Sequence, residues 1–508
     1  MKRLVIFLYI SSFLFIASCK KSVPGDTTPV PDPPLVPADQ SSFASAATIN
    51  QRLGRGINMG DTYEASWADK QADPNDFRRI AETGFRHVRL PVRWEIPSRG
   101  SYKTPYTIQP SFLAKIKASV DEALKNKLHI IINMHHHDSL FASPDAMKPM
   151  FLAQWRQIAD YFKGYSDSLL FEVLNEPHGN LDAQRWNTFF ADALKEIRKT
   201  NPKRIVLMGV ADWGGVSALN KLVFPTDNQL ILTIHYYSPF TFTHQGAGWV
   251  DGADAWLGTK WYDTDYDRQN VISDFTTAKQ IATDKNIPIH VGEFGAFNTA
   301  DMDSRVKWTR FLARWFEEQN FSWAYWEFNS GFGIYDPATG LYRTQLVDAL
   351  INDAMTSPVT TTLTDIYSSN FSSGADGWNL YNNDPSAAST MAIADSKVNV
   401  TITAAGNETW YIQLVRGNTS ITAGKLYRIV FNAFSNTSRN ISATIQQSLS
   451  PWTVYGNNDF NITATDATYS FVFTAPVTDA ACNFLFSMGK NGTSPVTIYN
   501  IKLQEVNF

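Results

Sequence analysis

Eight short apolar runs, each followed by a segment with helical periodicity, are the feature that most limits how this chain can fold. The alternation extends from about residue 49 to residue 355, and two of its helical segments are 110–125 and 301–319. Strands that alternate with helices predict a parallel sheet, and eight such units in about 300 residues are typical of a (β/α)8 barrel. A doubly wound open sheet is the alternative, but it would rarely place reactive groups on so many strand ends. The apolar runs are 56–59, 87–92, 129–134, 169–174, 204–208, 230–234, 287–291 and 321–326.

The composition of the whole chain narrows its class. With 508 residues the chain is too long for one domain of usual size. A hydrophobic fraction of 44% and a charged fraction of 18% are typical of a soluble globular protein. The net charge of −4, without a basic stripe, argues against nucleic-acid binding. Aromatic residues reach 13%, including 15 Trp, and this surplus suggests stacking surfaces.

The first residues are typical of a bacterial lipoprotein signal. Two basic residues precede an apolar run at 4–17, and a lipobox-like sequence then ends in Cys19. We expect residues 1–19 to be the signal and Cys19 to be lipidated, which predicts a secreted protein anchored at the bacterial cell surface or in the periplasm. An ordinary cleaved signal is the alternative, and the run is too short for a transmembrane anchor. Lipidation of Cys19 would leave Cys482 without an intramolecular disulfide partner.

Changes in composition divide the rest of the chain. Residues 20–41 are rich in Pro and Thr and predict an extended linker. The barrel is expected over 42–355, and a Ser/Thr/Pro linker follows at 356–365. In 366–508 short alternating runs predict an antiparallel β-sandwich. This last domain has no pair of acids at strand ends, so we interpret it as a binding module.

Two glutamates stand where a barrel carries its chemistry. Glu176 follows the fourth apolar run in Asn175-Glu176-Pro177, and Glu293 follows the seventh in Gly292-Glu293-Phe294. The carboxyl ends of barrel strands hold the active site, and two carboxylates there are what glycoside hydrolysis requires. Either residue taken alone could simply pair with a nearby arginine.

Other strand ends add polar and aromatic candidates. Arg89, in the second run, can hold a carboxylate ionised through a charge-assisted hydrogen bond. His235 and Tyr237 share one face of a strand and can point into the same cleft. Trp326 offers a ring on which a pyranose can stack. The full set of substrate-binding candidates is Arg89, His135, His136, Asn175, His235, Tyr237, Trp326, Glu327 and Glu64.

A long loop at 236–267 is rich in aromatic residues. Long loops in compact domains are usually functional, so we expect it to form a wall of a sugar cleft. At least half of its rings should instead pack the loop against the barrel.

A metal site is the main chemical alternative. His135 and His137 form a His-x-His at a strand end, as in barrels that bind zinc. Such a site needs further ligands on the middle strands and on strand eight, and the sequence does not offer them. We therefore predict no metal site. No Gly-rich phosphate loop or dinucleotide fingerprint is present in the sequence, so no cofactor is predicted.

Taken together and in this order, these motifs resemble glycoside hydrolase family five, in the clan of retaining barrel glycosidases. The resemblance covers 55–355, and it implies that Glu176 is the general acid/base and Glu293 the nucleophile. Their carboxyl groups should then lie about 5–5.5 Å apart. The segments 234–247 and 326–328 resemble the bacterial endoglucanase branch. Asp61 stands where some relatives carry Asn, which bears on the outermost sugar contact.

The C-terminal domain resembles jelly-roll carbohydrate-binding modules, on the basis of Gly377-Trp378, the segment 410–414 and the segment 424–427. Trp378 is expected in its core. For Trp410 and Trp452 a core role and a ligand contact remain open.

The expected function is retaining endo-β-glycanase action on internal β-1,4-glucan linkages, by a monomer whose partner is a polysaccharide such as β-glucan or glucomannan. A β-mannanase or xyloglucanase of the same family is one alternative. A non-catalytic glycan-binding surface lipoprotein is the other.

Overall fold

A closed eight-stranded parallel barrel forms the first body of the molecule. The computed structural model describes residues 38–65 and 71–508, so the signal segment, Cys19 and most of the predicted 20–41 linker lie outside it. The barrel strands follow chain order and β1 closes on β8, which confirms the predicted (β/α)8 fold. All eight predicted runs contain a strand. The barrel strands are β1 (Arg55–Asn58), β2 (His87–Leu90), β3 (His129–Asn133), β4 (Leu169–Glu172), β5 (Val206–Met208), β6 (Leu230–His235), β7 (Ile289–Glu293) and β8 (Ser322–Tyr325).

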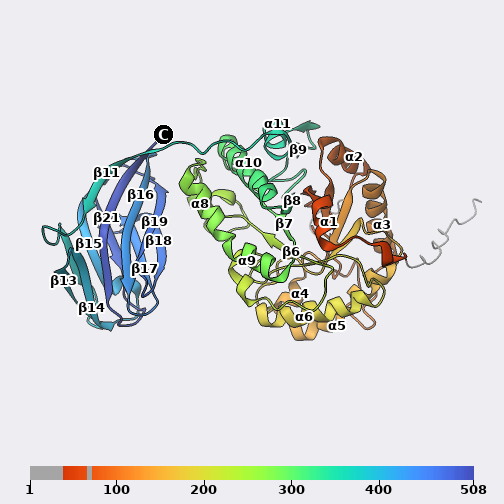
Figure 1. Cartoon of the computed structure of the whole chain (residues 1–508), viewed down its shortest axis with the longest axis horizontal. Helices are drawn as coiled ribbons and strands as arrows, with labels where there is room; N and C mark the ends of the chain where they lie inside the picture. The colour runs from red at the N-terminus through yellow and green to blue at the C-terminus, as the bar shows by residue number, and fades with distance from the viewer. Residues whose placement is uncertain (1–37, 66–70) are drawn as a thin grey trace, which may run out of the picture.

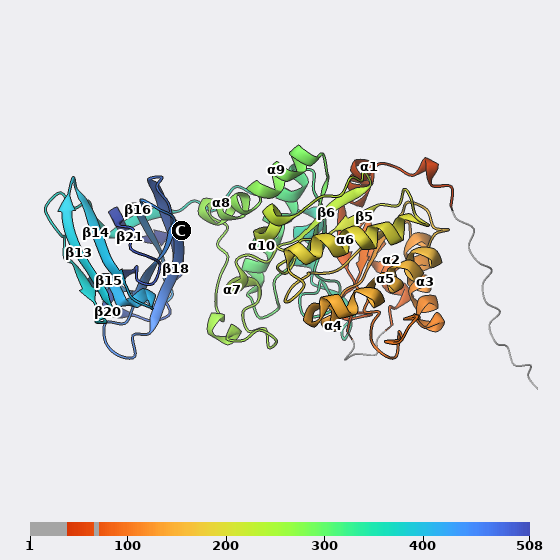
Figure 2. The ribbon, with the colours of Figure 1, turned by 90° about the horizontal axis from the view of Figure 1, so that it is seen from below.

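Helices surround the barrel, with α5 and α6 adjacent on its outer side (Figures 1 and 2). Local sequence signals determine where several of these helices begin. Pro110 opens α3 at the first helical position, and the Asp301 side chain caps α10 by accepting from the Ser304 amide. The helices are α1 (Ala46–Leu53), α2 (Pro74–Thr83), α3 (Pro110–Lys125), α4 (Asp138–Ala142), α5 (Pro144–Tyr161), α6 (Ala183–Arg198), α7 (Phe240–Thr243), α8 (Asp265–Asp274), α9 (Thr276–Lys285), α10 (Met302–Glu318) and α11 (Thr344–Val347).

Helix α1 closes the amino end of the barrel. Its residues Ile49 and Leu53 are fully buried against strand residues that include Ile131 and Ile231. None of the helices in the described residues combines the length and the apolar character that crossing a membrane requires.

The second body consists of two antiparallel sheets, consistent with the predicted sandwich. One sheet has the order β13-β14-β21-β16-β19, with β11 paired to β21, and the other has the order β12-β15-β20-β17-β18. Strand β11 begins at Thr362, inside the predicted 356–365 linker, because it pairs with the last strand of the domain. The remaining strands are β9 (Tyr335–Asp336), β10 (Leu341–Tyr342), β11 (Thr362–Ser369), β12 (Trp378–Asn382), β13 (Ala387–Ala394), β14 (Lys397–Ala405), β15 (Ile412–Ile421), β16 (Leu426–Ser435), β17 (Arg439–Gln446), β18 (Val454–Ile462), β19 (Ala467–Thr474), β20 (Asp479–Ser487) and β21 (Val496–Asn507).

Candidate active site

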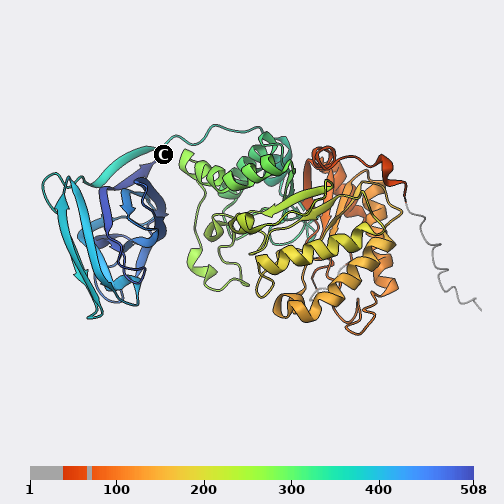
Figure 3. The same ribbon diagram turned by 60° about the horizontal axis from the view of Figure 1, so that its bottom comes forward.

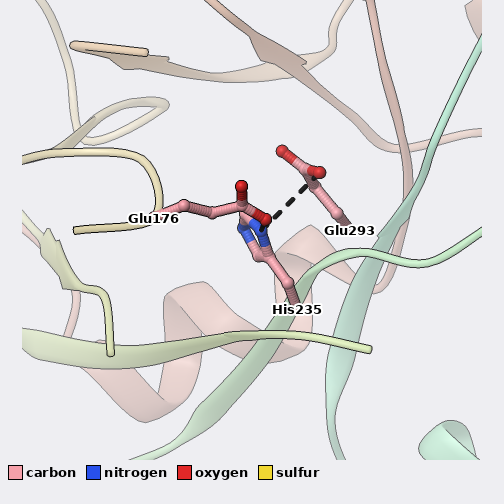
Figure 4. Close-up of side chains that lie close together, drawn as sticks. All are labelled: Glu176, His235 and Glu293. Carbon is pink, nitrogen blue, oxygen red and sulfur yellow. Dashed lines mark hydrogen bonds and ion pairs between the residues drawn. The ribbon is translucent and has the colours of Figure 1, made fainter. Parts of the chain in front are cut away.

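Glu176 and Glu293 meet at the carboxyl end of the barrel. Glu293 is the last residue of β7, and Glu176 lies in the turn after β4. One carboxylate oxygen of each lies within 4.8 Å of the other, with His235 beside both (Figure 4). Carboxyl groups about 5 Å apart leave no room for a water between them, which is the arrangement of retaining glycosidases.

Three side chains surround the Glu293 carboxylate. The Arg89 Nη1 donates to Glu293 Oε1 at 2.7 Å, and the Tyr237 hydroxyl donates to Oε2 at 2.9 Å. His235 Nδ1 lies 3.6 Å from Oε2. Burial raises the pKa of Glu293, while His235 and Arg89 oppose that rise. The two donated hydrogen bonds are best matched to the ionised form, which is the form that a nucleophile needs.

Arg89 is fully buried and connects Glu293 to the rest of the barrel interior. Its Nε and Nη2 donate to the two oxygens of Glu172 at 2.6 and 2.7 Å. Its other bonds reach Asn58 Oδ1 at 2.8 Å and Asn175 Oδ1 at 2.7 Å. The arginine is thus held in place by β4 and by the residue before Glu176.

Glu172 is a buried partner of Arg89 that is not among the candidates predicted from the sequence. Burial would raise the pKa of this carboxyl, but the Arg89 guanidinium lowers it below its ordinary value. A lone charged residue inside a buried apolar strand needs a partner, and this could have identified it.

Glu176 occupies a strained backbone position. Its φ is 44°, in the left-handed region, and Gly214 lies close by with its own φ of 72°. A Cβ on Gly214 would stand 3.3 Å from Glu176 Cγ and 3.2 Å from the His235 ring. Glycine at position 214 therefore allows its loop to approach Glu176 and His235 closely.

Burial raises the pKa of Glu176 to about 7. His235 Nδ1 lies 2.8 Å from Glu176 Oε1, and burial lowers the pKa of this histidine. A neutral His235 can donate a hydrogen bond from Nδ1–H to an ionised Glu176, or, in the other tautomer, accept a hydrogen bond at Nδ1 from the acid form. The pair can therefore hold Glu176 in either protonation state.

A second group of rings lies beside the pair. Trp326 follows β8, and its ring is nearly parallel to that of His135, with 5.7 Å between centroids and 9° between planes. His135 Nδ1 is hydrogen-bonded to Asn133 Nδ2 at 3.1 Å, and burial lowers the pKa of this histidine well below its ordinary value. His136 contacts His135 edge to face at 4.8 Å. The two predicted histidines and Trp326 therefore form one surface.

The predicted contacts Glu64 and Glu327 belong to a buried acidic group. Glu64 accepts hydrogen bonds from the Asp61 amide and, at 3.1 Å, from the Thr62 amide, and it is only 2% exposed. Ser330 donates to Asp61. Burial raises the pKa of Glu64 to about 7 and raises the pKa of Glu327 well above its ordinary value. Both glutamates therefore carry protons at neutral pH more readily than exposed carboxyls do.

The rings of the aromatic loop at 236–267 differ in how far they are buried. Tyr236, Phe242 and Trp261 are buried, so the expectation that rings pack against the barrel holds for these three. Phe240 and Trp249 are exposed. The Phe240 ring stacks on His244 at 4.0 Å, and His244 in turn contacts the Tyr237 ring at 5.0 Å. The cleft wall therefore stays a prediction, for which Phe240 and Trp249 are exposed candidates.

Trp213 is a further exposed ring near Glu176 that no sequence pattern marked. It stacks on His178 with 3.5 Å between centroids and 11° between planes, and it is 61% exposed. Asp212, Trp213 and Gly214 all have left-handed backbones. This turn places the ring, and no local sequence signal announces it because only Gly214 is a usual residue for such a conformation.

The zinc-type alternative lacks support in the structure. Within residues 38–65 and 71–508, the group of His and carboxylate atoms close enough to hold a metal ion is Glu176, His235 and Glu293. His137 is not part of it, and its Nδ1 contacts Ser139 Oγ at 3.3 Å. The His-x-His motif therefore does not assemble a metal-binding set with other described residues.

In the C-terminal domain, Trp378 is 1% exposed and belongs to the core, as predicted. Trp410 and Trp452 are 50% and 57% exposed, so neither is a core residue. Trp410 precedes β15 and Trp452 lies between β17 and β18, both at the border of the five-stranded sheet. Tyr381 of β12 is a third exposed ring of that sheet.

Comparison with known families identifies two regions. Residues 51–331 match the family described as cellulase (glycosyl hydrolase family 5). Residues 365–494 match a carbohydrate binding domain.

Several named proteins are similar to the barrel region. Endoglucanase H of Acetivibrio thermocellus is 36% identical over 313 residues, which cover 59% of this chain but only 33% of that protein. The chain thus spans about a third of this relative. Endoglucanase A of Ruminococcus albus is 29% identical over 326 residues, covering 58% of this chain and 86% of that protein.

Solved structures are also similar. Endoglucanase Cel5A of Thermotoga maritima is 43% identical, with a TM-score of 0.59, and the match covers 61% of this chain and all of that one. The same enzyme has been solved with mannotriose, at 43% identity, a TM-score of 0.59 and coverage of 60% and 100%. A cellulose synthase subunit, CcsZ of Clostridioides difficile, is 35% identical, with a TM-score of 0.57 and coverage of 59% and 100%.

Proposed function

The chain belongs to glycosyl hydrolase family 5, and from this membership we propose that it is a retaining endoglucanase that hydrolyses internal β-1,4-glucan linkages. The observation that carries the proposal is the pair Glu176 and Glu293, with oxygens within 4.8 Å at the open end of the barrel. Similar proteins named endoglucanases support the choice of glucan.

In the proposed reaction the two glutamates take different parts. Glu293, held by Arg89 and Tyr237, attacks the anomeric carbon and forms a covalent glycosyl-enzyme. Glu176 in its acid form protonates the leaving oxygen, and as a carboxylate it then takes a proton from the water that hydrolyses the intermediate. A pKa of about 7 suits both steps, because each form is then populated near neutral pH.

Aromatic rings near the strand ends support a cleft that binds sugar units. Trp326 stacks with His135, and the exposed Trp213 stacks with His178. We propose that pyranose rings stack on the accessible faces of Trp326 and Trp213. The predicted contacts His136, Asn175, Glu64 and Glu327 belong to the same proposal.

A β-mannanase or xyloglucanase of the same family is the second candidate, favoured by the relative solved with mannotriose. Glucose and mannose differ in the orientation of one hydroxyl. A site built to bind that hydroxyl rejects the other sugar strongly, whereas a site with adaptable polar groups accepts both. Because the similar Thermotoga maritima enzyme was solved with mannotriose and with cellobiose, we expect glucan and glucomannan to be cut.

The test is a reducing-sugar assay of the purified protein on β-glucan, carboxymethylcellulose, glucomannan, xyloglucan and xylan, with Glu293→Ala as the inactive control. Activity on β-glucan with shorter products of internal cutting supports the proposal. Activity on xylan alone would overturn the hexose-backbone assignment. Glycan binding without turnover of any polymer would favour the non-catalytic alternative.

We further propose that the C-terminal domain, which matches a carbohydrate binding domain, binds polysaccharide. The exposed rings of Tyr381, Trp410 and Trp452 support this role. The lipid anchor at Cys19 is also a proposal, supported by the lipobox-like sequence alone.

A further inference from the structure

The connection between barrel and C-terminal domain is much shorter than the sequence suggests. The Val359 amide donates to the Asp263 carbonyl at 2.8 Å, so the chain is still held by the barrel at this point. Strand β11 begins at Thr362, which leaves Thr360 and Thr361 between the two bodies. The three Cα–Cα steps from Val359 to Thr362 span at most about 11 Å when the chain is extended. Figure 3 shows this single crossing between the two bodies.

The residues that hold the linker belong to segment 261–268, which we call the dock. Trp261 is buried in the barrel core. Arg268 donates to both oxygens of Asp263 at 2.7 and 2.8 Å, and its Nη1 donates to the Thr356 carbonyl at 2.8 Å. One arginine thus ties the dock to the start of the linker.

The other face of the dock contacts the C-terminal domain. The Tyr262 ring stacks on Phe508 with 4.6 Å between centroids and 21° between planes. The Tyr266 hydroxyl donates to the Ser470 carbonyl at 3.1 Å, and the Arg428 guanidinium lies 6.0 Å from the Tyr266 ring. Helix α8, which contains Tyr266, lies beside this domain in both views (Figures 1 and 2).

The dock contacts named above do not involve the five-stranded sheet of the C-terminal domain. Arg428 is on β16 and Ser470 is on β19, and both strands belong to the other sheet. The exposed rings Tyr381, Trp410 and Trp452 belong to the five-stranded sheet and its borders, outside the contact.

We propose that the dock holds the barrel and the C-terminal domain as one body in solution, so that the five-stranded sheet keeps a constant direction relative to the active-site cleft. The physical reason is the set of dock contacts, which the linker makes intramolecular. A short flexible tether gives such contacts an effective concentration in the millimolar range, and lengthening it by six residues lowers this concentration only severalfold. The functional consequence, guidance of a polymer bound on the sheet toward the cleft, rests on the proposed function.

Small-angle X-ray scattering tests the first part without any activity measurement. Four full-length proteins are compared: the natural chain, a variant with six Gly/Ser residues inserted between Thr360 and Thr361, the same insertion with Tyr262→Ala and Tyr266→Ala, and the insertion with Tyr102→Ala. Tyr102 is an exposed tyrosine of the barrel and serves as the matched control. The scattering curve of the natural chain should be fitted by a single rigid arrangement of the two domains. The insertion alone should leave the radius of gyration nearly unchanged, as should the Tyr102 control, whereas loss of both dock tyrosines should increase it.

Two results would overturn the proposal. One is a natural chain whose scattering fits only a mixture of domain orientations. The other is an insertion that expands the molecule as much with the dock tyrosines as without them.

Activity then tests the consequence. The inserted variant lacking both tyrosines should keep its rate on a soluble oligosaccharide and lose severalfold on insoluble glucan. Equal rates on insoluble glucan, with the expansion observed, would refute guidance while leaving the dock itself intact. An inactive natural chain that still scatters as one body would refute only the proposed function.

Discussion

Replacing Glu176 by alanine should separate the two carboxylate roles, because only one of them depends on a proton. Burial raises the pKa of Glu176 to about 7. Half of such groups are protonated at pH 7, whereas a carboxyl with a pKa near 4.5 would be protonated in about one molecule in 300. Activity of the natural enzyme should therefore fall as pH rises through about 7, where the acid loses its proton.

The size of the loss depends on the leaving group. On β-glucan, removal of the acid should cost about 10²–10⁴-fold in kcat, the usual contribution of proton transfer. An aryl glycoside with a good leaving group needs almost no proton, so kcat/KM for it should change little. In Glu176→Ala, the fall of activity above about pH 7 that we expect of the natural enzyme should be absent.

The configuration of the product formed with added azide shows which glutamate carries the intermediate. In Glu176→Ala the glycosyl-enzyme on Glu293 should form and then wait for a nucleophile, since no base activates water. Added azide should speed its release and give a β-azide product, which NMR identifies. Glu293→Ala should be inactive on every substrate. An α-azide product from Glu176→Ala, or rescue to β-azide in Glu293→Ala, would refute the assignment of the two roles.

Four further predictions concern other parts of the protein. Arg89→Met should leave the Glu172 carboxylate buried without its cation and lower the free energy of unfolding by about 3–5 kcal/mol, measured by urea denaturation at pH 7; an unchanged midpoint would contradict the assigned ion pair. Burial lowers the pKa of His87 to about 3, so the unfolded chain binds a proton that the folded chain refuses, and stability should fall as pH drops from about 6.5 toward about 3. A His87→Asn variant should lose part of this pH dependence, and an unaltered slope would exclude the histidine as its source. Truncation after Met355 should preserve activity on soluble oligosaccharide and weaken retention on polysaccharide in affinity electrophoresis; equal retention would argue against the binding role. Cys19→Ala should release the protein from the membrane fraction or block its processing, and unchanged membrane association would exclude the lipid anchor.

The sequence predicted the barrel well because its signals are local. An apolar run reports a buried parallel strand wherever it occurs, and Pro110 marks the start of α3 at the residue where the structure has it. The position of a glutamate after such a run also places it at the open end of the barrel. Glu176 and Glu293 could therefore be named as a pair from their strand order alone.

Other features lie outside the reach of local signals. Trp213 is positioned by a left-handed turn that its own sequence does not announce. Glu64 stays a proposed substrate contact, but only the folded loop shows that its carboxylate accepts hydrogen bonds from the Asp61 and Thr62 amides, where burial raises its pKa to about 7. The 356–365 segment read as a free linker, and it is held to the barrel at Thr356 and Val359.

The order of the strands and the division into two bodies follow from local sequence patterns, because the burial of a strand depends on its own residues. The same patterns predict Glu176 and Glu293 at strand ends. What surrounds these two carboxylates depends on the folded barrel. The bonds from Arg89 to Glu172 and Glu293 join β2 with β4 and β7. Which side chains meet inside a barrel depends on the register and tilt of all its strands, a property of the closed sheet that no single segment contains. For the same reason the hydrogen bond between His235 and Glu176, and the pKa of about 7 that follows from burial of Glu176, belong to the folded barrel alone.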